Sequence, residues 1–239
     1  MDSYSVVWYF LIYGFLGWVV EVCFHALAQG KLVNRGFLNG AICPIYGFGV
    51  VLVVWILEPV ASHGILLFAG ATVLCSVLEW ITGFILAKAF HQRWWDYTDE
   101  PLNIGGYICL RFSLMWGLAC VFVVKLIHPS IQWLLDLVPE TLGLILMSIF
   151  LLGLLVDVAA TINTIMGLNK KLKRIEEAAA AIRHLSDELT EQLYEGAIKA
   201  KEEIEEEKLT LSQKRILKAF PKAKSTKHLG AMEKLRKRL

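Results

Sequence analysis

The stretch HQRWWDYTDEPLNIGGYICLRFSLMWG, residues 91–117, connects two long apolar runs and shows best how the chain is organised. It carries paired tryptophans, three acids and an asparagine, and an arginine, Arg111, lies within the apolar run that follows. The pair Gly105 and Gly106 allows a tight backbone turn just before that run. A simple connection between two helices needs none of these features, so we predict a folded or partly re-entrant loop.

Hydropathy divides the chain into an apolar first part and a more charged last third. Of its 239 residues 56% are hydrophobic, and the mean hydropathy is +0.54. The apolar residues form runs of about 20, the length that crosses a bilayer core, and most of the charged residues follow residue 167. We therefore predict a transmembrane domain, residues 1–167, and a region of amphipathic helix and basic tail, residues 168–239. The first apolar run lacks the flanks of a cleaved signal peptide and is predicted to be a retained span.

The predicted fold class is all-α, a polytopic membrane helix bundle with a cytoplasmic helical C-terminal extension. Residues 128–139 have the pattern of a short amphipathic helix at the membrane interface. The number of transmembrane helices is five, or six if this piece or the connection 91–106 inserts. The five predicted spans are residues 6–28, 40–59, 65–90, 107–127 and 140–166.

The distribution of Lys and Arg predicts the orientation in the membrane. The N-terminal tail and the connection 60–64 carry none, and the connection 128–139 has at most Lys125, at the end of the helix before it. By contrast, Lys31, Arg35, Lys88 and Arg93 lie in or beside the connections 29–39 and 91–106. The positive-inside rule then predicts a multi-pass protein of the cell membrane with its N-terminus outside and its C-terminus cytoplasmic. The loop within residues 91–106 would face the cytoplasm.

The last third of the chain has three parts. Apolar residues at helical spacing, beginning with Leu172, Ile175 and Ala179, predict an amphipathic helix over 168–195 that could pair with a second copy or a partner subunit. Residues 202–207 are an acidic block, and residues 214–239 carry ten Lys and Arg against one acid. Such a tail is expected to bind anionic lipid headgroups of the bilayer. Nucleic acid is not an expected partner, because no reader motif is present.

Four ionisable residues fall inside the predicted spans: Glu21, Glu79, Arg111 and Asp157. Burying one charge at the bilayer centre costs about 3 kcal/mol or more, so such groups pair, face inward or line a wet cavity. The simplest arrangement pairs Arg111 with at least one acid. Because one arginine cannot neutralise three acids, at least one acid must be protonated, solvated or paired with an arriving group. The set is either an ion pair that fixes the helices or the lining of a polar site.

Other chemistry finds less support. Glu21 with His25, and Glu79 with His91, could ligate a metal, but histidines are sparse, and neither a metal nor a cofactor is expected. Cys43 lacks a histidine within a few residues to act as its base, as does Cys109. No nucleotide-binding loop or hydrolase motif is present.

The motifs of residues 8–118 resemble one family, that of the CmpB-type ABC-transporter type IV permeases. These are bacterial multi-spanning membrane proteins with vertebrate relatives of unassigned role. The matching motifs are Gly17-Trp18-x-x-Glu21, RGFLNGAICPIYG (35–47), Leu78-Glu79 with Gly83, Trp95-Asp96-Tyr97, Asn103, Gly106, Ile108-Cys109-Leu110 and Trp116-Gly117. One departure is Tyr107, where a basic residue is expected. The resemblance implies a common architecture and one site, whose candidate residues are Glu21, Cys43, Tyr46, Glu79, Trp95, Asp96, Tyr97, Asn103 and Arg111.

We therefore expect a transporter component or small-molecule or ion carrier with a cytoplasm-facing polar cavity. Glu21, Glu79 and Arg111 would line the cavity, and the loop 95–103 would be its lid. One alternative is a membrane enzyme acting on a lipid or lipid-linked headgroup, with an acid such as Glu79 or Asp96 as base. The other alternative is a structural or assembly membrane protein.

Overall fold

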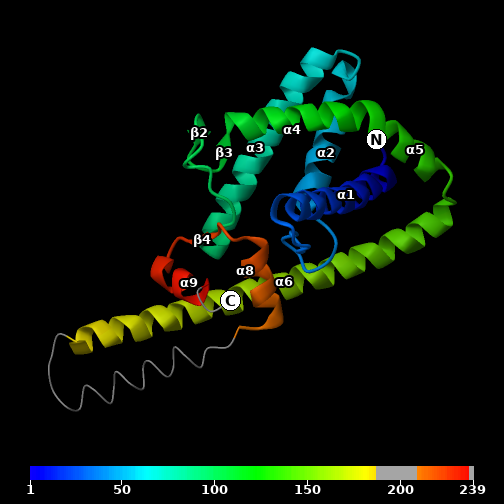
Figure 1. Ribbon diagram of the computed structural model, residues 1–239. Helices are drawn as coiled ribbons and strands as arrows, with labels where there is room; N and C mark the ends of the chain where they lie inside the picture. Colours follow the sequence, from blue (N-terminus) through cyan, green and yellow to red (C-terminus); the bar gives the residue numbers. More distant parts are fainter. Residues whose placement is uncertain (187–208, 237–239) are drawn as a thin grey trace.

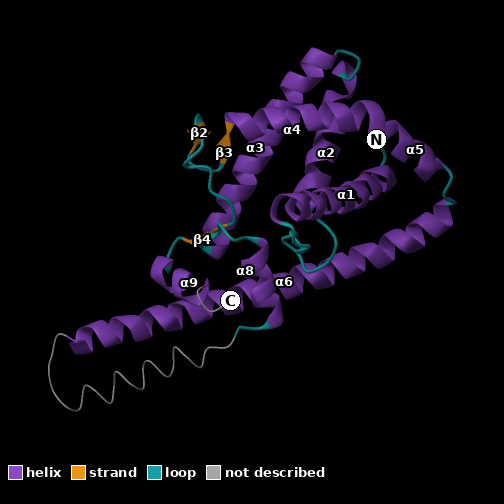
Figure 2. Cartoon of the chain, in the orientation of Figure 1, coloured by secondary structure: helices purple, strands orange, loops and turns teal. Residues whose placement is uncertain are grey.

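A computed structural model describes residues 1–186 and 209–236, which are mostly helical with a few two-residue strands (Figure 2). Two sequence predictions fall partly or wholly outside the described residues. These are the acidic block 202–207 and residues 187–195 of the predicted amphipathic helix. The last three residues are outside them as well. The elements in order are α1 (Ser3–Gln29), α2 (Pro44–Leu57), η1 (Glu58–Val60), α3 (Gly64–Phe90), β1 (Gln92–Arg93), β2 (Asn103–Ile104), β3 (Ile108–Cys109), α4 (Leu110–Phe122), η2 (Val123–Ile127), α5 (His128–Asp136), α6 (Glu140–Ser186), α8 (Leu211–Ala219), β4 (Lys224–Ser225) and α9 (Leu229–Arg236).

Four of these helical stretches are long and apolar enough to cross a membrane: Ser3–Ala28, Gly64–Phe90, Leu110–Asp136 and Glu140–Ala180. Many of their large apolar side chains face outward, as suits lipid and not water. The 14 residues of α2 reach only about 21 Å, less than the roughly 30 Å of a hydrocarbon core. The predicted class, an all-α membrane bundle, is confirmed. Four full-length helices and the shorter α2 lie where five spans were predicted, so the count of five, or six, stays a prediction.

The first four membrane-domain helices pack in chain order, α1 on α2, α2 on α3 and α3 on α4. The contact between α1 and α2 depends on glycine. A Cβ atom at Gly17 would overlap the ring of Tyr46, and one at Gly47 would overlap the carbonyl oxygen of Phe10. Gly17 and Gly47 thus let the two helices approach closely. We call the end of the bundle where α1 and α3 finish and α2 and α4 begin the loop end.

The fourth membrane helix does not stop at residue 127, where its span was predicted to end. A five-residue π-helical turn, η2, joins α4 to α5, and Pro129 lies in the first turn of α5. Because proline has no N–H, it removes one backbone hydrogen bond and leaves a wider turn before it. The piece predicted to be a separate interfacial helix is therefore the bent continuation of α4.

Helix α6 has 47 residues, which at about 1.5 Å each make roughly 70 Å, twice the thickness of a bilayer core. It runs without a break through residue 167, the predicted domain boundary. Its second half lies beside α8 and α9 (Figure 1). Their shared core is Leu168, Leu172, Ile175, Leu217, Ala231, Met232 and Leu235.

The C-terminal segment, which we define as residues 209–236, also contacts the loop end of the bundle. Strand β4 pairs antiparallel with β1, with Gln92 opposite Ser225 and Arg93 opposite Lys224. Beside this pair Trp94 is 4% exposed and lies edge-on between Phe37 and Phe220, at centroid distances of 5.2 and 5.1 Å. Trp94 is thus not an aromatic anchor at the lipid surface but the centre of a small core.

Replacing Trp94 with Ala is expected to release the C-terminal segment, because removing a buried tryptophan costs about 3–5 kcal/mol. Limited proteolysis of the purified protein should then cut near residues 209–236 much faster than in the wild type. The matched control is Trp133→Ala, since that ring is 62% exposed. Equal cleavage rates in Trp94→Ala and the control would contradict the assigned core.

Candidate functional site

The first acid of the predicted spans, Glu21, is half-buried and is held by a tyrosine and an arginine. The Tyr46 hydroxyl donates to Glu21 Oε1 at 2.7 Å, and Arg35 Nε lies 3.8 Å from Glu21 Oε2. Tyr46 reaches Glu21 because Gly17, one turn earlier on α1, leaves room for its ring. The Arg35 side chain also donates through Nη1 to the carbonyl oxygen of Ala219 at 2.6 Å. This carboxylate therefore has both a hydrogen-bond donor and a cation.

The second acid, Glu79, is held by a tyrosine alone. The Tyr97 hydroxyl donates to Glu79 Oε1 at 3.1 Å, and Glu79 is 8% exposed. Its other oxygen, Oε2, is buried without a hydrogen-bond partner among the described residues. Burial, the Glu79 carboxylate and, more weakly, Cys109 and Glu21 raise the pKa of Tyr97, so its hydroxyl keeps the proton that it donates.

The two tyrosine–carboxylate pairs meet on one face of α4. The Tyr97 ring stacks on Phe112 at a centroid distance of 4.8 Å, and the Tyr46 ring meets the edge of Trp116 at 5.4 Å. Phe112 and Trp116 are four residues apart, one turn of a helix, and so lie on the same side of α4. Because both tyrosine rings pack on this side of α4, we treat the two pairs, Glu21–Tyr46 and Glu79–Tyr97, as one site.

The third acid, Asp157 on α6, is fully supplied with neutral donors. Its Oδ1 accepts from the backbone N–H and the side-chain amide of Asn39, both at 3.0 Å. Its Oδ2 accepts from the backbone N–H of Gly40 at 2.7 Å. Asn39 also donates to Thr161 Oγ1 at 3.0 Å. Asp157 thus fastens the connection between α1 and α2 to α6 and does not join the two tyrosine–carboxylate pairs.

Arg111 does not pair with any of these three acids, which corrects the arrangement expected from the sequence. Its ion pair is with Glu100, at 3.9 Å, and its side chain is 70% exposed. Strands β2 and β3 occupy residues 103–109, so α4 begins only at Leu110. Arg111 therefore lies in the first helical turn, at the loop end, where a long cationic side chain can reach polar surroundings.

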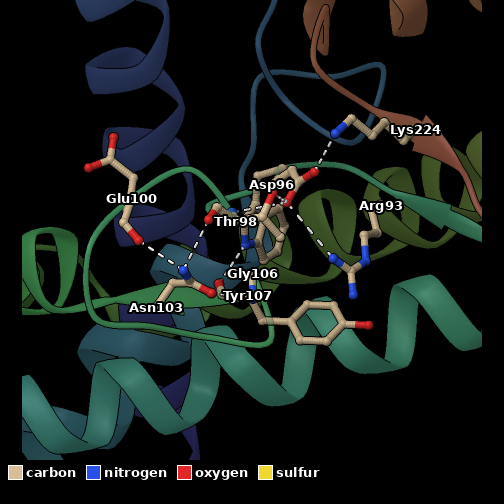
Figure 3. A network of polar contacts seen from close by, with 9 residues as sticks. Arg93, Asp96, Thr98, Glu100, Asn103, Gly106, Tyr107 and Lys224 are labelled. Atoms are coloured by element: carbon tan, nitrogen blue, oxygen red, sulfur yellow. Dashed lines mark hydrogen bonds and ion pairs between the residues drawn. The ribbon is translucent and has the colours of Figure 1, made fainter.

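The loop before α4 is folded, as predicted, around Asp96 and Asn103 (Figure 3). Asn103 Nδ2 donates to the carbonyl oxygens of Thr98 and Glu100, and its Oδ1 accepts from the N–H of Gly106. Gly105 and Gly106 have φ of +62° and +72°, the left-handed values that two central residues of a tight hairpin turn require. A Cβ at Gly106 would come 2.9 Å from Asp96 Oδ1. These contacts explain the paired glycines.

Asp96 connects this loop to the C-terminal segment. Lys224 Nζ donates to Asp96 Oδ2 at 2.6 Å, and Arg93 lies 3.8 Å from Oδ1. Burial opposes ionisation of the carboxyl, but hydrogen bonds from Lys224 and Thr98 outweigh it and lower the pKa of Asp96 to about 2. Asp96 is thus a charged anchor for the tail rather than part of the two tyrosine–carboxylate pairs.

The two remaining predicted site residues, Trp95 and Cys43, form hydrogen bonds to backbone carbonyl oxygens. Trp95 donates from Nε1 to the carbonyl oxygen of Tyr107 at 2.8 Å and lies against Gly83. Cys43 precedes α2, and its N–H donates to the carbonyl oxygen of Gly14 at 2.9 Å. No group of three or more His, Cys, Asp and Glu side chains that could hold a metal is found in residues 1–186 and 209–236.

Two residues that sequence reasoning did not select as site residues are Arg35 and Asn39. Both belong to the motif RGFLNGAICPIYG, so the resemblance contained the signal, but their partners could not be read from it. Arg35 meets Glu21, and Asn39 meets Asp157 across 118 positions of the chain. Arg35, not Arg111, is the basic residue that pairs with an acid of a span.

Apolar helices of membrane-spanning length around a buried acidic site define a multi-pass membrane protein. The chain belongs to the CmpB family, described as "Putative ABC-transporter type IV", which matches residues 8–162. The match includes all of the residues predicted for the site and extends through Asp157. No curated protein and no solved structure matches the chain.

Gly17→Ala is expected to destabilise the protein, because the added methyl group overlaps the Tyr46 ring and displaces its hydroxyl from Glu21. Gly153→Ala is the matched control, since a Cβ there meets nothing within 4 Å, and glycine to alanine inside a helix is otherwise favourable by about 0.5–1 kcal/mol. Thermal unfolding in detergent should show a lower Tm for Gly17→Ala only. A Tm at or above that of the wild type would contradict the contact.

Attachment of the C-terminal segment should depend on pH in a defined direction. The pKa of Asp96 falls from 3.8 to about 2 on folding, so its contribution is complete above about pH 4 and is lost toward pH 2. The pKa of Lys224 is raised from 10.5 by the hydrogen bond that its ammonium group donates to Asp96, so its contribution is complete below that value. Amide exchange at Lys224 and Ser225 should be constant from about pH 5 to 9, after correction for intrinsic rates, and rise below about pH 4. Asp96→Asn should abolish that acid dependence, and an unchanged dependence would contradict the assignment.

Proposed function

We propose that this protein is a transporter component or carrier that binds a small polar solute at the two tyrosine–carboxylate pairs. One observation carries the proposal. Glu21–Tyr46 and Glu79–Tyr97 converge on one face of α4 within an apolar bundle, and one carboxylate oxygen of Glu79 has no donor in the described part of the chain. A purely structural acid is expected to be fully satisfied, as Asp157 is. Membership of a family described in terms of transport agrees with this proposal.

The distribution of basic residues supports a site that opens toward the cytoplasm. Lys31, Arg35, Lys88 and Arg93 all lie at the loop end, and Arg35 contacts Glu21. By the positive-inside rule this end faces the cytoplasm. The C-terminal segment, which contacts the loop end through β1 and β4, would then be cytoplasmic too. The hairpin loop that carries Tyr97 would be the lid over the site, and a polar cavity would form when it moves.

Polar side chains continue from Glu79 into the bundle between α3 and α4. Ser76 Oγ, one turn from Glu79, donates to Ser113 Oγ at 2.7 Å, and Ser113 is buried. Thr72, a further turn along α3, lies against Gly117. Hydroxyl groups in an apolar bundle give a solute hydrogen-bond partners along its way. This seam favours passage through the helices over a site confined to the membrane surface.

The test compares cells that express the wild type, the double variant Glu21→Gln/Glu79→Gln, or the control Glu58→Gln, whose acid is exposed beyond the end of α2. Small molecules are profiled in cells and medium against an empty vector. The wild type and the control should shift the distribution of at least one polar solute, and the double variant should not. The amount of folded protein, measured by fluorescence-detected gel filtration, should be the same for all three.

Other results would point to the alternatives. An unchanged solute shift in the double variant would contradict the proposal. A change in lipid composition that the double variant removes, without any solute shift, would favour an enzyme acting on lipid headgroups. Loss of folded double variant, with normal solute profiles in every strain, would favour a structural role.

A further inference from the structure

The three acids of the spans differ in how their charge is balanced. Asp157 accepts hydrogen bonds at both oxygens, and Glu21 has the Tyr46 hydroxyl at one oxygen and Arg35 near the other. Glu79 has one donor, Tyr97, and its Oε2 is buried and unpartnered within the described chain. It is also the most buried of the three, at 8% exposed. Glu79 is therefore the position where a further group is missing.

We take the missing group to be a positive charge, because a neutral donor, Tyr97, is already present. Among the side chains that the structure describes, no Lys, Arg or His forms an ion pair with Glu79. The basic residues of the neighbouring loop are engaged elsewhere, Arg111 with Glu100 and Arg93 with Asp96. Lys224 of the C-terminal segment also binds Asp96. A buried carboxylate without a counter-ion is strongly destabilising, so a cation that reaches it gains a large electrostatic attraction.

The side chains around Glu79 indicate what kind of cation fits. Tyr97 stacks on Phe112, and Tyr46 lies against Trp116, so aromatic rings gather beside the carboxylates. Aromatic faces attract ammonium groups, quaternary ones included. A calcium or magnesium ion instead needs six or more oxygen ligands, or several retained waters. No cluster of three potential metal ligands occurs in the described residues.

We infer that Glu79, together with the rings of Tyr97 and Phe112, binds a small organic cation, either a protonated amine or a quaternary ammonium. The inference rests on the proposed function, since it names the chemical class of the solute. The cation places its charge at Glu79 Oε2, and the aromatic rings cover its apolar surface. Glu21 lies near enough to influence Tyr97 and adds negative potential. Arg35 neutralises Glu21, so the pair of acids keeps one net negative charge for one monovalent cation.

The experiment measures thermal stabilisation of the purified full-length protein in lipid nanodiscs. The probes are methylammonium, choline and 3,3-dimethyl-1-butanol, the uncharged isostere of choline. We expect at least one of the two cations to raise Tm with saturation, because a ligand that binds only the folded state stabilises it. The isostere should give no shift at the same concentrations.

Variants assign the effect to Glu79. Glu79→Gln should weaken binding by about thirtyfold or more, since it removes one partner of a buried charge pair. Tyr97→Phe keeps the ring on Phe112 and should weaken binding by about three- to tenfold, which keeps the test decisive if Glu79→Gln does not fold. The control Glu58→Gln, an acid at the opposite end of the bundle, should bind as the wild type does.

Three results would overturn the inference: no Tm shift with either cation, an equal shift with the isostere, or unchanged binding in both Glu79→Gln and Tyr97→Phe. Its failure is distinguishable from that of the proposed function. If a solute shift in cells depends on Glu21 and Glu79 but no ammonium compound binds, the proposed carrier function holds and its solute belongs to another chemical class. If neither a solute shift in cells nor cation binding is found, the proposed function and the cation inference are both contradicted.

Discussion

A carboxylate inside an apolar helix bundle must be given donors or a cation, and the structure is arranged around this constraint. Glycine at position 17 lets the Tyr46 ring lie on α1, which brings its hydroxyl to Glu21. The hairpin turn before α4 sets Tyr97 over Glu79. The connection between α1 and α2 is held to α6 through the hydrogen bonds of Asp157. Each of the three acids thus holds two parts of the membrane domain together.

The same connections join the site to the C-terminal segment. Arg35 binds the carbonyl oxygen of Ala219 while it faces Glu21. In return Arg215 donates to the carbonyl oxygens of Gly36 and Phe37. On the other side Lys224 binds Asp96 in the loop that carries Tyr97. Both tyrosine–carboxylate pairs are therefore contacted, through one intermediate each, by residues 209–236, so a change in that segment can alter the site.

The sequence predicted the helices and the folded loop, which depend on neighbouring residues. It did not predict the contacts between residues far apart in the chain. Apolar runs placed the membrane helices, and the glycine pair at 105 and 106 predicted a folded loop, because length and backbone freedom are local properties. The pairing of Arg111 was wrong, because two short strands shift the start of α4 and carry the arginine out to Glu100. The basic tail gave no sign that Lys224 would meet Asp96 across 128 positions. Charge counts predict that acids need partners but not which partners they find.

The central claim is that Glu21–Tyr46 and Glu79–Tyr97 form one site, and a double-mutant cycle on stability tests it most directly. The free energy of unfolding would be measured for the wild type, Glu21→Gln, Glu79→Gln and the double variant in the same nanodiscs. Neighbouring charges couple by about 0.5 kcal/mol or more, whereas independent sites add to within about 0.3–0.5 kcal/mol. We predict a coupling energy of about 1 kcal/mol, in the range found for residues in contact or in one network. Additive effects of the two substitutions would contradict a single site.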